Sequence, residues 1–214
     1  MIAYADLRDR YLAAQLAGNR REAVRVVLEE GFAQGARVVE LQERVIQAAQ
    51  DEIGKLWQQN RVTIAQEHMA TAISHLSLAA LFERATPATR LGRKLLLACV
   101  EGELHDLPAR MVADLLELEG FEVRYLGASV PHEALVAMVA SEQPDVIGLS
   151  VTMAFNVPSL RIAVSRVRGV TARPIFIGGH ALRWQLGLAN ELHVESAGAS
   201  ADEVIATAKR LADL

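Results

Sequence analysis

The sequence predicts an α/β protein with an additional all-α part: an N-terminal four-helix bundle followed by a doubly wound parallel sheet of five strands. Residues before about 90 show amphipathic helical patterns and no strand-like run, whereas short apolar runs and helical patterns alternate after that point. Runs such as Val146–Ser150 are apolar at nearly every position, which is typical of parallel strands covered on both faces. We place the helical domain at 1–85, a linker at 86–93 and the α/β domain at 94–214.

Four helices are expected in the first domain, because apolar side chains recur there every three or four residues. The fourth helix starts at Thr63, whose hydroxyl can cap it, and Gln66 completes a capping box. This helix is apolar on most sides, so we expect it in the interior of the bundle. The expected helices span 2–17, 20–32, 36–59 and 63–83.

Strands and helices alternate in the second domain, which implies βαβ units and a flavodoxin-like, Rossmann-type sheet. Ligands of such sheets bind at the carboxyl ends of the strands. The expected strands are Lys94–Val100, Glu122–Leu126, Val146–Val151, Pro174–Ile177 and His193–Ser196. The expected helices span 108–119, 131–141, 158–168, 181–189 and 201–213.

Composition and charge exclude several classes of protein. The 214 residues are 51% apolar and 22% charged, which is typical of a folded chain. The net charge of −4 argues against direct contact with nucleic acid, and no apolar run is long enough to span a membrane. Cys99 is the single cysteine, which excludes an intrachain disulfide and suits a cytoplasmic location.

The loop after the first expected strand carries the strongest chemical signal. It reads Glu103-Leu104-His105-Asp106-Leu107-Pro108 and leads into a helix that the proline can open. Carboxylates before and after His105 can reach its second ring nitrogen, which would orient the ring and raise its basicity. His105 is therefore a candidate metal ligand, although a surface histidine in an acidic loop would have the same spacing.

Two further strand ends carry polar or small residues. Ser150 and Thr152 offer hydroxyl groups at the end of the third strand. Gly178 and Gly179 end the fourth strand, where the missing side chains would let a flat ligand approach the backbone. A glycine pair can equally well make a turn. Together with His105, these residues would gather at one edge of the sheet.

This arrangement resembles the cobalamin-binding domains, whose pattern is Asp-x-His-x-x-Gly, then Ser-x-Leu, then Gly-Gly. The matching residues here are Glu103, His105 and Pro108, then Ser150 and Thr152, then Gly178 and Gly179. The resemblance covers residue 94 to the C-terminus. Three positions differ, with Glu for Asp, Pro for Gly and Thr for Leu. A glutamate can still hydrogen-bond the imidazole, whereas Pro108 changes the loop.

The resemblance implies that His105 is the lower axial ligand of the cobalt in cobalamin. The dimethylbenzimidazole tail of the cofactor would be displaced into a slot between the sheet and its helices. Asp106 and Leu107 would contact the cofactor beside His105. The slot would be lined by Ser150, Thr152, Gly178, Gly179, Gly198 and Ser200.

The first domain resembles the four-helix cap of the light-sensing cobalamin regulators of the CarH type. Their cap carries a tryptophan, nine further residues and then Glu-His, and here Trp57 precedes Glu67-His68 at that spacing. The resemblance implies adenosylcobalamin, with Trp57 beside the adenosyl group and Glu67 accepting hydrogen bonds from ribose hydroxyls. Taken singly, the tryptophan and the histidine would be ordinary core residues. Those regulators often have a histidine, the upper cobalt ligand after illumination, where this chain has Gln58, so water, His68 or His75 would fill that role.

We therefore expect a non-enzymatic cobalamin-binding regulator that senses light through adenosylcobalamin, with methylcobalamin and hydroxocobalamin as the other possible forms. Its signal would pass through a protein partner, such as a transcription regulator, or through self-association, without direct contact to nucleic acid or membrane. A methyl-carrying corrinoid protein of a methyltransferase system is the first alternative. A flavodoxin-like interaction module without cobalamin is the second.

Overall fold

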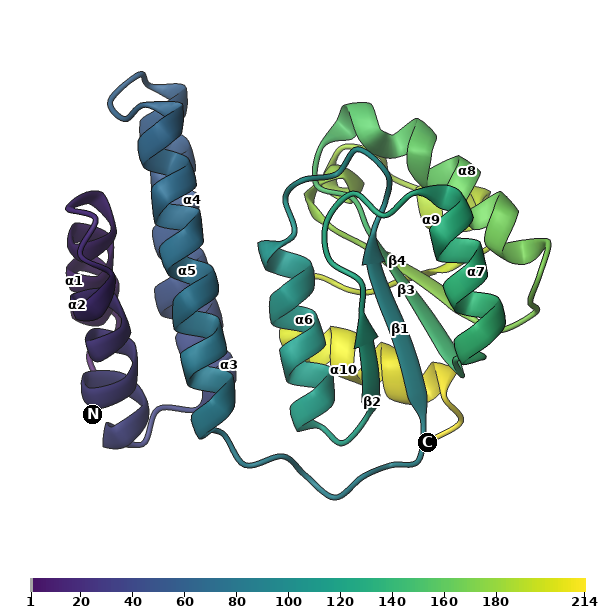
Figure 1. The fold of residues 1–214 in the computed structure, drawn as a ribbon, viewed down its shortest axis with the longest axis horizontal. Coiled ribbons are helices and arrows are strands. Elements are labelled where there is room, and N and C mark those ends of the chain that lie inside the picture. Colours follow the sequence, from purple (N-terminus) through teal and green to yellow (C-terminus); the bar gives the residue numbers. More distant parts are fainter. Residues whose placement is uncertain (1) are drawn as a thin grey trace. The chain divides into compact units, whose positions relative to one another are not determined.

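The structure is a computed structural model that describes residues 2–214. The chain divides into two compact units, which we call the helical unit (Met1–Thr86) and the sheet unit (Pro87–Leu214). Figure 1 shows helices alone in the first and a sheet flanked by helices in the second. The predicted fold class, all-α followed by doubly wound α/β, is confirmed.

The helical unit contains four helical rods, as predicted (Figure 1). Each of the two middle rods contains one wide π-helical turn, which the sequence pattern did not predict because periodicity does not resolve a single turn. The elements are α1 (Tyr4–Leu16), α2 (Arg20–Arg25) with the π turn Val26–Gly31 and the 3₁₀ turn Phe32–Gln34, α3 (Val38–Leu41), the π turn Gln42–Gln47, α4 (Ala48–Gln58) and α5 (Ile64–Arg84).

Helix α5 begins with the predicted capping box. Thr63 Oγ1 accepts a hydrogen bond from the backbone nitrogen of Gln66 at 3.2 Å, and the Gln66 side chain accepts one from the backbone nitrogen of Thr63 at 2.8 Å. The expectation that α5 is an interior helix is wrong. Only one face of it is buried within the structure, and Ile64 and Leu76 are 57% and 43% exposed on the other.

The sheet unit has five parallel strands in the order β2-β1-β3-β4-β5, the flavodoxin-like order. In this order β1, β3 and β4 are neighbours, so their carboxyl ends lie side by side. The strands are β1 (Lys94–Cys99), β2 (Glu122–Tyr125), β3 (Val146–Ser150), β4 (Ile175–Gly178) and β5 (Glu195–Ser196). The helices are α6 (Leu107–Leu118), α7 (His132–Glu142), α8 (Val157–Arg168), α9 (Leu188–Glu191) and α10 (Ala201–Leu211).

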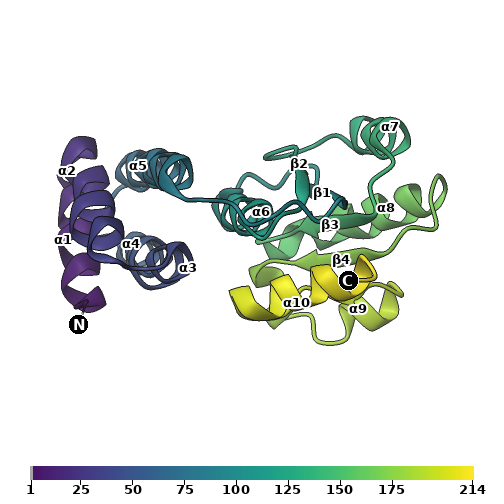
Figure 2. The same ribbon diagram turned by 90° about the horizontal axis from the view of Figure 1, so that it is seen from below.

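Both faces of the sheet are buried, which explains the continuous apolar runs. Alternate residues of β1 point to opposite sides, so Leu95 and Leu97 join one core with α6 and α10. Leu96 and Ala98 join a second core with α7 and α8 on the other side. Figure 2 shows helices on both sides of the strands. A strand with two buried faces is apolar at nearly every position.

Two elements near the C-terminus differ from the prediction. The expected helix 181–189 is instead a 3₁₀ turn, His180–Arg183, and the single helical turn of α9. Gly187 lies between them at φ +85°, a left-handed conformation that ends a continuous helix. The last strand is shorter than expected because His193 also has a positive φ, +52°, and is excluded from the extended backbone.

The first residues of the sheet unit, before β1, are hydrogen-bonded to the end of α6 and the turn that follows it. The backbone nitrogen of Ala88 donates to the carbonyl of Leu118 at 2.7 Å, and that of Leu91 donates to the carbonyl of Gly120 at 2.9 Å. Gly120 has φ +99°, and a Cβ there would lie 2.3 Å from the carbonyl oxygen of Thr89. The close approach of this segment to the end of α6 therefore requires a glycine.

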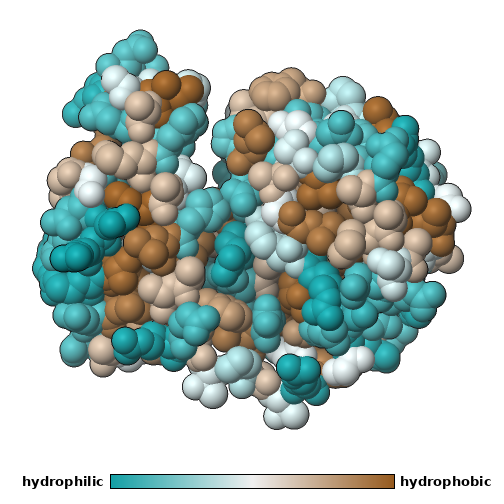
Figure 3. Space-filling view, viewed as in Figure 1, coloured by the Kyte–Doolittle hydropathy of each residue, from teal (hydrophilic) through white to brown (hydrophobic). Residues whose placement is uncertain are grey.

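Hydrophobic side chains reach the surface in both units, as the space-filling view shows (Figure 3). In the sheet unit the most exposed are Leu104, Phe155, Trp184 and Leu186. The first three follow β1, β3 and β4, respectively. Within residues 2–214, no helix combines the length and the apolar character needed to cross a membrane.

Candidate functional site

Glu103 and His105 lie in the loop after β1, where the Glu103 carboxylate is hydrogen-bonded to the histidine. The Glu103 side chain is fully buried, and its Oε1 accepts hydrogen bonds from the ring Nδ1 of His105 at 2.7 Å and from the His105 backbone nitrogen at 2.9 Å. The imidazole itself is 53% exposed. With Nδ1 bound to the carboxylate, Nε2 is the ring nitrogen that would ligate a metal.

The second oxygen of Glu103 ties this loop to the segment after β3. Oε2 accepts hydrogen bonds from the backbone nitrogens of Thr152 and Met153 at 2.9 and 2.8 Å, and from Nδ2 of Asn156 at 3.0 Å. One carboxylate therefore fixes the histidine and joins two strand ends. The sequence motif predicted that Glu103 contacts His105, but it did not predict that Thr152, Met153 and Asn156 also donate to Glu103.

The charge on Glu103 is stabilised by its partners. Burial by itself would raise the pKa of this carboxyl group, but the hydrogen bonds from His105, Met153 and Asn156 outweigh that effect and lower the pKa from 4.5 to about 2. A carboxylate that stays ionised strengthens the basicity and orientation of the histidine that it contacts.

The residues that follow His105 open helix α6. The hydroxyl of Tyr125 lies 3.1 Å from both the backbone carbonyl oxygen and Oδ2 of Asp106, and its single hydrogen is shared between these two acceptors. Leu107 is buried, and Pro108 occupies the first turn of the helix as expected. Tyr125 lies at the end of β2, and no sequence pattern pointed to it.

A second set of contacts holds the other end of the same loop. Glu101 Oε2 lies 2.7 Å from Nδ1 of His132, at the start of α7. The hydroxyl of Ser159 donates to the carbonyl of Glu101 at 2.7 Å, and the backbone nitrogen of Ser129 donates to the carbonyl of Glu103 at 2.8 Å. His132 thus helps to hold this loop in place.

A narrow cavity of about 50 Å³ lies where the slot was predicted. It is smaller than an aromatic ligand needs, so the walls must move apart to admit one. The lining residues are Leu97, Pro108, Ala109, Val112, Leu149, Ser150, Phe176, Gly178, Gly179 and Ala197. Of the residues predicted for the slot, Ser150, Gly178 and Gly179 are among them.

The cavity lining does not include the other residues predicted for the slot, which are Thr152, Gly198 and Ser200. The hydroxyl of Thr152 is buried without a hydrogen-bond partner among residues 2–214, which suits a polar group of an added ligand. Ser200 accepts a hydrogen bond from the backbone nitrogen of Glu203 at 3.3 Å and caps α10. Gly198 has φ +99°, and the residue before it, Ala197, lines the cavity.

Gly179 makes the closest backbone approach in this region. Its φ is +109°, and a Cβ would lie 2.2 Å from the carbonyl oxygen of Val151. Two backbone hydrogen bonds also cross this turn. The nitrogen of Val151 donates to the carbonyl of Gly178, and the nitrogen of Ala181 donates to the carbonyl of Val151. A side chain at position 179 would therefore push the turn after β4 away from β3.

The cap residues, by which we mean Trp57, Glu67 and His68, lie at one end of the helical unit. Trp57 is 46% exposed near the end of α4, and the other two lie in the first turns of α5. Glu67 Oε2 lies 2.6 Å from Nδ1 of His68. The carboxylate of Glu67 is one-quarter exposed, so it can still meet a ligand.

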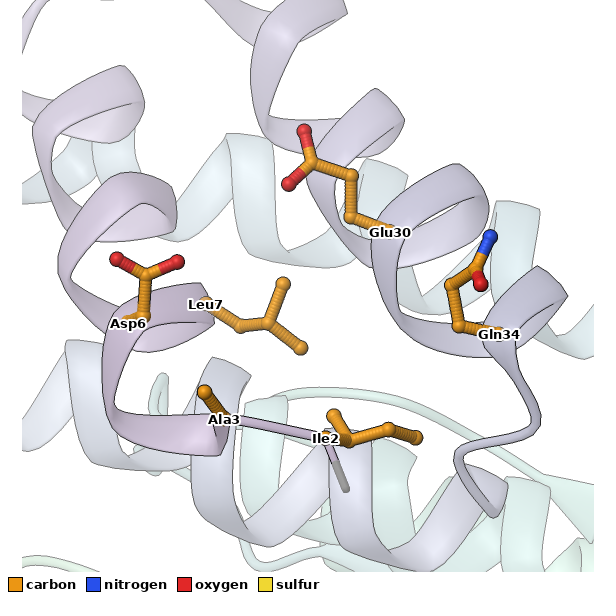
Figure 4. A pocket seen from close by; sticks show the side chains of 6 residues that line it. All are labelled: Ile2, Ala3, Asp6, Leu7, Glu30 and Gln34. Atoms are coloured by element: carbon orange, nitrogen blue, oxygen red, sulfur yellow. The ribbon is translucent and has the colours of Figure 1, made fainter.

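A larger depression of about 350 Å³ lies at the start of α1. Figure 4 shows its lining, which includes Leu7 and the carboxylates of Asp6 and Glu30. Glu30 is paired with Arg10 and with Arg25, so its charge is satisfied within the unit. None of the predicted site residues lines this depression.

The chain is similar to proteins of two kinds, transcriptional repressors and corrinoid proteins. The chain is 30% identical over 147 residues to the HTH-type transcriptional repressor CarH of Myxococcus xanthus, in a match that covers 67% of this chain and 48% of the repressor. It is 26% identical over 180 residues to dimethylamine corrinoid protein 1 of Methanosarcina acetivorans, which covers 80% of this chain and 82% of that protein. The chain thus spans about half the length of the repressor.

The fold is shared with a solved corrinoid protein. The monomethylamine corrinoid protein of Methanosarcina barkeri superposes with a TM-score of 0.80 at 17% identity, over 98% of this chain and all of that one. Two family models, both described as B12 binding domain, match residues 93–208 and 7–81. The first alone covers more than half of the chain. The chain therefore belongs to the B12-binding domain family, and its cofactor is cobalamin.

Proposed function

We propose that the protein is a light sensor that binds adenosylcobalamin, with His105 as the lower ligand of cobalt. The spacing from Trp57 to Glu67-His68 carries the sensor part of the proposal, and the buried carboxylate of Glu103, which holds a half-exposed imidazole at the carboxyl edge of the sheet, carries the choice of His105. Such an edge is where sheets of this order bind ligands. The family match removes the alternative of an α/β module without cobalamin.

The chain's own residues would hold the cofactor in two ways. Glu103 orients the ring of His105, and the cavity beside Ser150 and Gly178 would take the displaced tail once its walls have opened. The unpartnered hydroxyl of Thr152 would hydrogen-bond a polar group of that tail. Asp106, Leu107, Gly198 and Ser200 would complete the surroundings.

The adenosyl group is assigned to the cap residues. Trp57 offers an exposed indole face, and Glu67 offers carboxylate oxygens that can accept from ribose hydroxyls. Bound adenosylcobalamin supplies a cobalt–carbon bond that light can cleave. Loss of the adenosyl group would remove contacts from Trp57 and Glu67, and the altered surface of the helical unit would change self-association or the binding of a protein partner. In this account the chain signals and does not catalyse.

A methyl carrier in a methyltransferase system is the second candidate. It is favoured by the coverage of the relatives: the dimethylamine corrinoid protein matches over 82% of its length, whereas CarH matches over 48%. The Trp57…Glu67-His68 spacing favours the sensor. A carrier would retain methylcobalamin, and its binding of cobalamin would not depend on these three side chains.

Absorption spectra test the two candidates. The purified chain is mixed with adenosylcobalamin in the dark and then exposed to green light, beside His105→Ala and the control His193→Ala. A sensor gives a histidine-ligated dark spectrum that changes irreversibly in light, absent in His105→Ala and retained in His193→Ala. Stable loading with methylcobalamin, and no light response beyond that of free adenosylcobalamin, would instead identify the carrier.

A further inference from the structure

A chain of polar side chains runs from the interior of the helical unit to the carboxylate of Glu67. Gln15 of α1, which is fully buried, donates from Nε2 to Oε1 of Gln50 at 3.1 Å. Nε2 of Gln50, on α4, donates to the hydroxyl of Thr71 at 2.7 Å. That hydroxyl donates to Oε1 of Glu67 at 2.9 Å. The chain thus joins three helices.

Every link of this chain has the same direction. A hydroxyl has one hydrogen, so Thr71 can donate to Glu67 only while it accepts from Gln50. The oxygen of Gln50 lies 3.1 Å from Nε2 of Gln15, whose two hydrogens are shared with the carbonyl of Ala70 at 3.0 Å and the hydroxyl of Ser74 at 2.9 Å. Gln15 thus anchors the amide of Gln50 from the interior of the unit. Aligned donors polarise one another and strengthen the last bond, which is the one to the charged group.

The two oxygens of Glu67 are therefore held differently. Oε1 is bound through this chain to the interior, whereas Oε2 contacts His68, whose side chain is 71% exposed. A contact to an exposed side chain fixes a carboxylate poorly, since that side chain keeps much of its own rotamer freedom. Thr71 is thus the contact that sets the rotamer of Glu67.

We infer that Thr71 and Gln50 are positioning residues that hold the Glu67 carboxylate for the ribose hydroxyls of the adenosyl group. The inference rests on the proposed adenosyl-binding role of Glu67. It assigns a role in ligand selectivity to two side chains that would not themselves touch the cofactor. Methylcobalamin has no ribose at that position, so its affinity should not depend on them.

The test is the ratio of the dissociation constants of methylcobalamin and adenosylcobalamin, both measured in the dark by titration. A high ratio means a preference for adenosylcobalamin. Thr71→Val removes the hydroxyl and should lower this ratio about tenfold, the factor expected for one hydrogen bond to a charged group. Gln50→Leu should lower it about threefold. Thr71→Ser keeps the hydroxyl and should remain within about twofold of the wild type. A general loss of stability would weaken both ligands together and leave the ratio unchanged.

Two controls separate the failure of this inference from that of the proposed function. Glu67→Gln reports whether the carboxylate contributes to adenosyl selectivity at all, and Gln47→Leu reports the effect of a glutamine change in the same helical rod. If Glu67→Gln lowers the preference and Thr71→Val does not, the positioning role is wrong and the sensor proposal stands. If Glu67→Gln has the same ratio of dissociation constants as the wild type, the adenosyl role of Glu67 is wrong, and this inference is wrong with it.

Discussion

The side chain of Glu103 is fully buried, yet it lies two residues from a half-exposed histidine. A buried carboxylate is costly unless donors surround it, and Glu103 accepts hydrogen bonds from the ring and backbone of His105, two further backbone nitrogens and the amide of Asn156. The same contacts fix the rotamer of Glu103 and therefore the ring of His105. The hydrogen bonds that stabilise the buried carboxylate of Glu103 thus also orient the candidate ligand His105.

Acid should destabilise the protein through this group. Because the pKa of Glu103 is lowered from 4.5 to about 2, its ionised form stabilises the fold above pH 4.5, and that stabilisation is lost as the pH falls towards 2. The loss is on the order of 3 kcal/mol. We expect Glu103→Gln to be less stable at pH 7 and to show a shallower loss of unfolding free energy between pH 4.5 and 2, measured by urea unfolding.

Glu117→Gln is the matched control for this experiment, since Glu117 is an exposed carboxylate of the same unit. Its pH dependence should follow that of the wild type. An equal slope in Glu103→Gln and the wild type over this interval would contradict the stabilising role of the ionised Glu103.

At the scale of the elements, the sequence is most informative where burial dictates the residue type. The strands β1 and β3 are apolar on both faces because helices cover both, and their positions could be predicted to within one residue. Helix 181–189 could not be predicted correctly, because a single left-handed glycine, Gly187, interrupts a stretch that otherwise has helical composition.

The candidate site could be predicted only in part, for a similar reason. The spacing of Glu103 and His105 is local, so a motif can encode it. Asn156 and Tyr125 reach the same loop from other elements, and their contacts arise from tertiary packing that no local pattern records. The π turns of the helical unit were missed as well, because they alter the backbone more than the residue types.

The turn after β4 supplies a prediction about backbone geometry. Gly179→Ala should destabilise the fold by roughly 3 kcal/mol, because the new Cβ would meet the carbonyl of Val151 in addition to the strain of a positive φ. Gly187→Ala should cost only about 1 kcal/mol, since its φ is also positive but no atom lies within 4 Å of the added carbon. Chemical denaturation of both variants provides the comparison, and equal losses would rule out the close contact at position 179.

At the scale of the whole molecule, the chain has two compact units and predicted cofactor contacts in each. If one cofactor uses both sets, adenosylcobalamin should slow amide hydrogen exchange in the segments 101–108 and 150–153 and also around the α4–α5 turn. Methylcobalamin should protect the first two segments more than the third. Protection confined to the sheet unit with adenosylcobalamin would contradict an adenosyl role for the cap residues.

The most direct test of the central claim, that His105 ligates cobalt, is electron paramagnetic resonance of the bound cob(II)alamin form. The protein is prepared with ordinary histidine and with nitrogen-15 histidine, while the cofactor keeps its natural nitrogen. The account predicts that the axial-nitrogen splitting changes from a triplet to a doublet on labelling, and that labelled His105→Ala shows no doublet. A triplet that persists in the labelled protein would show that the cofactor's own base still ligates the metal, and would contradict the claim.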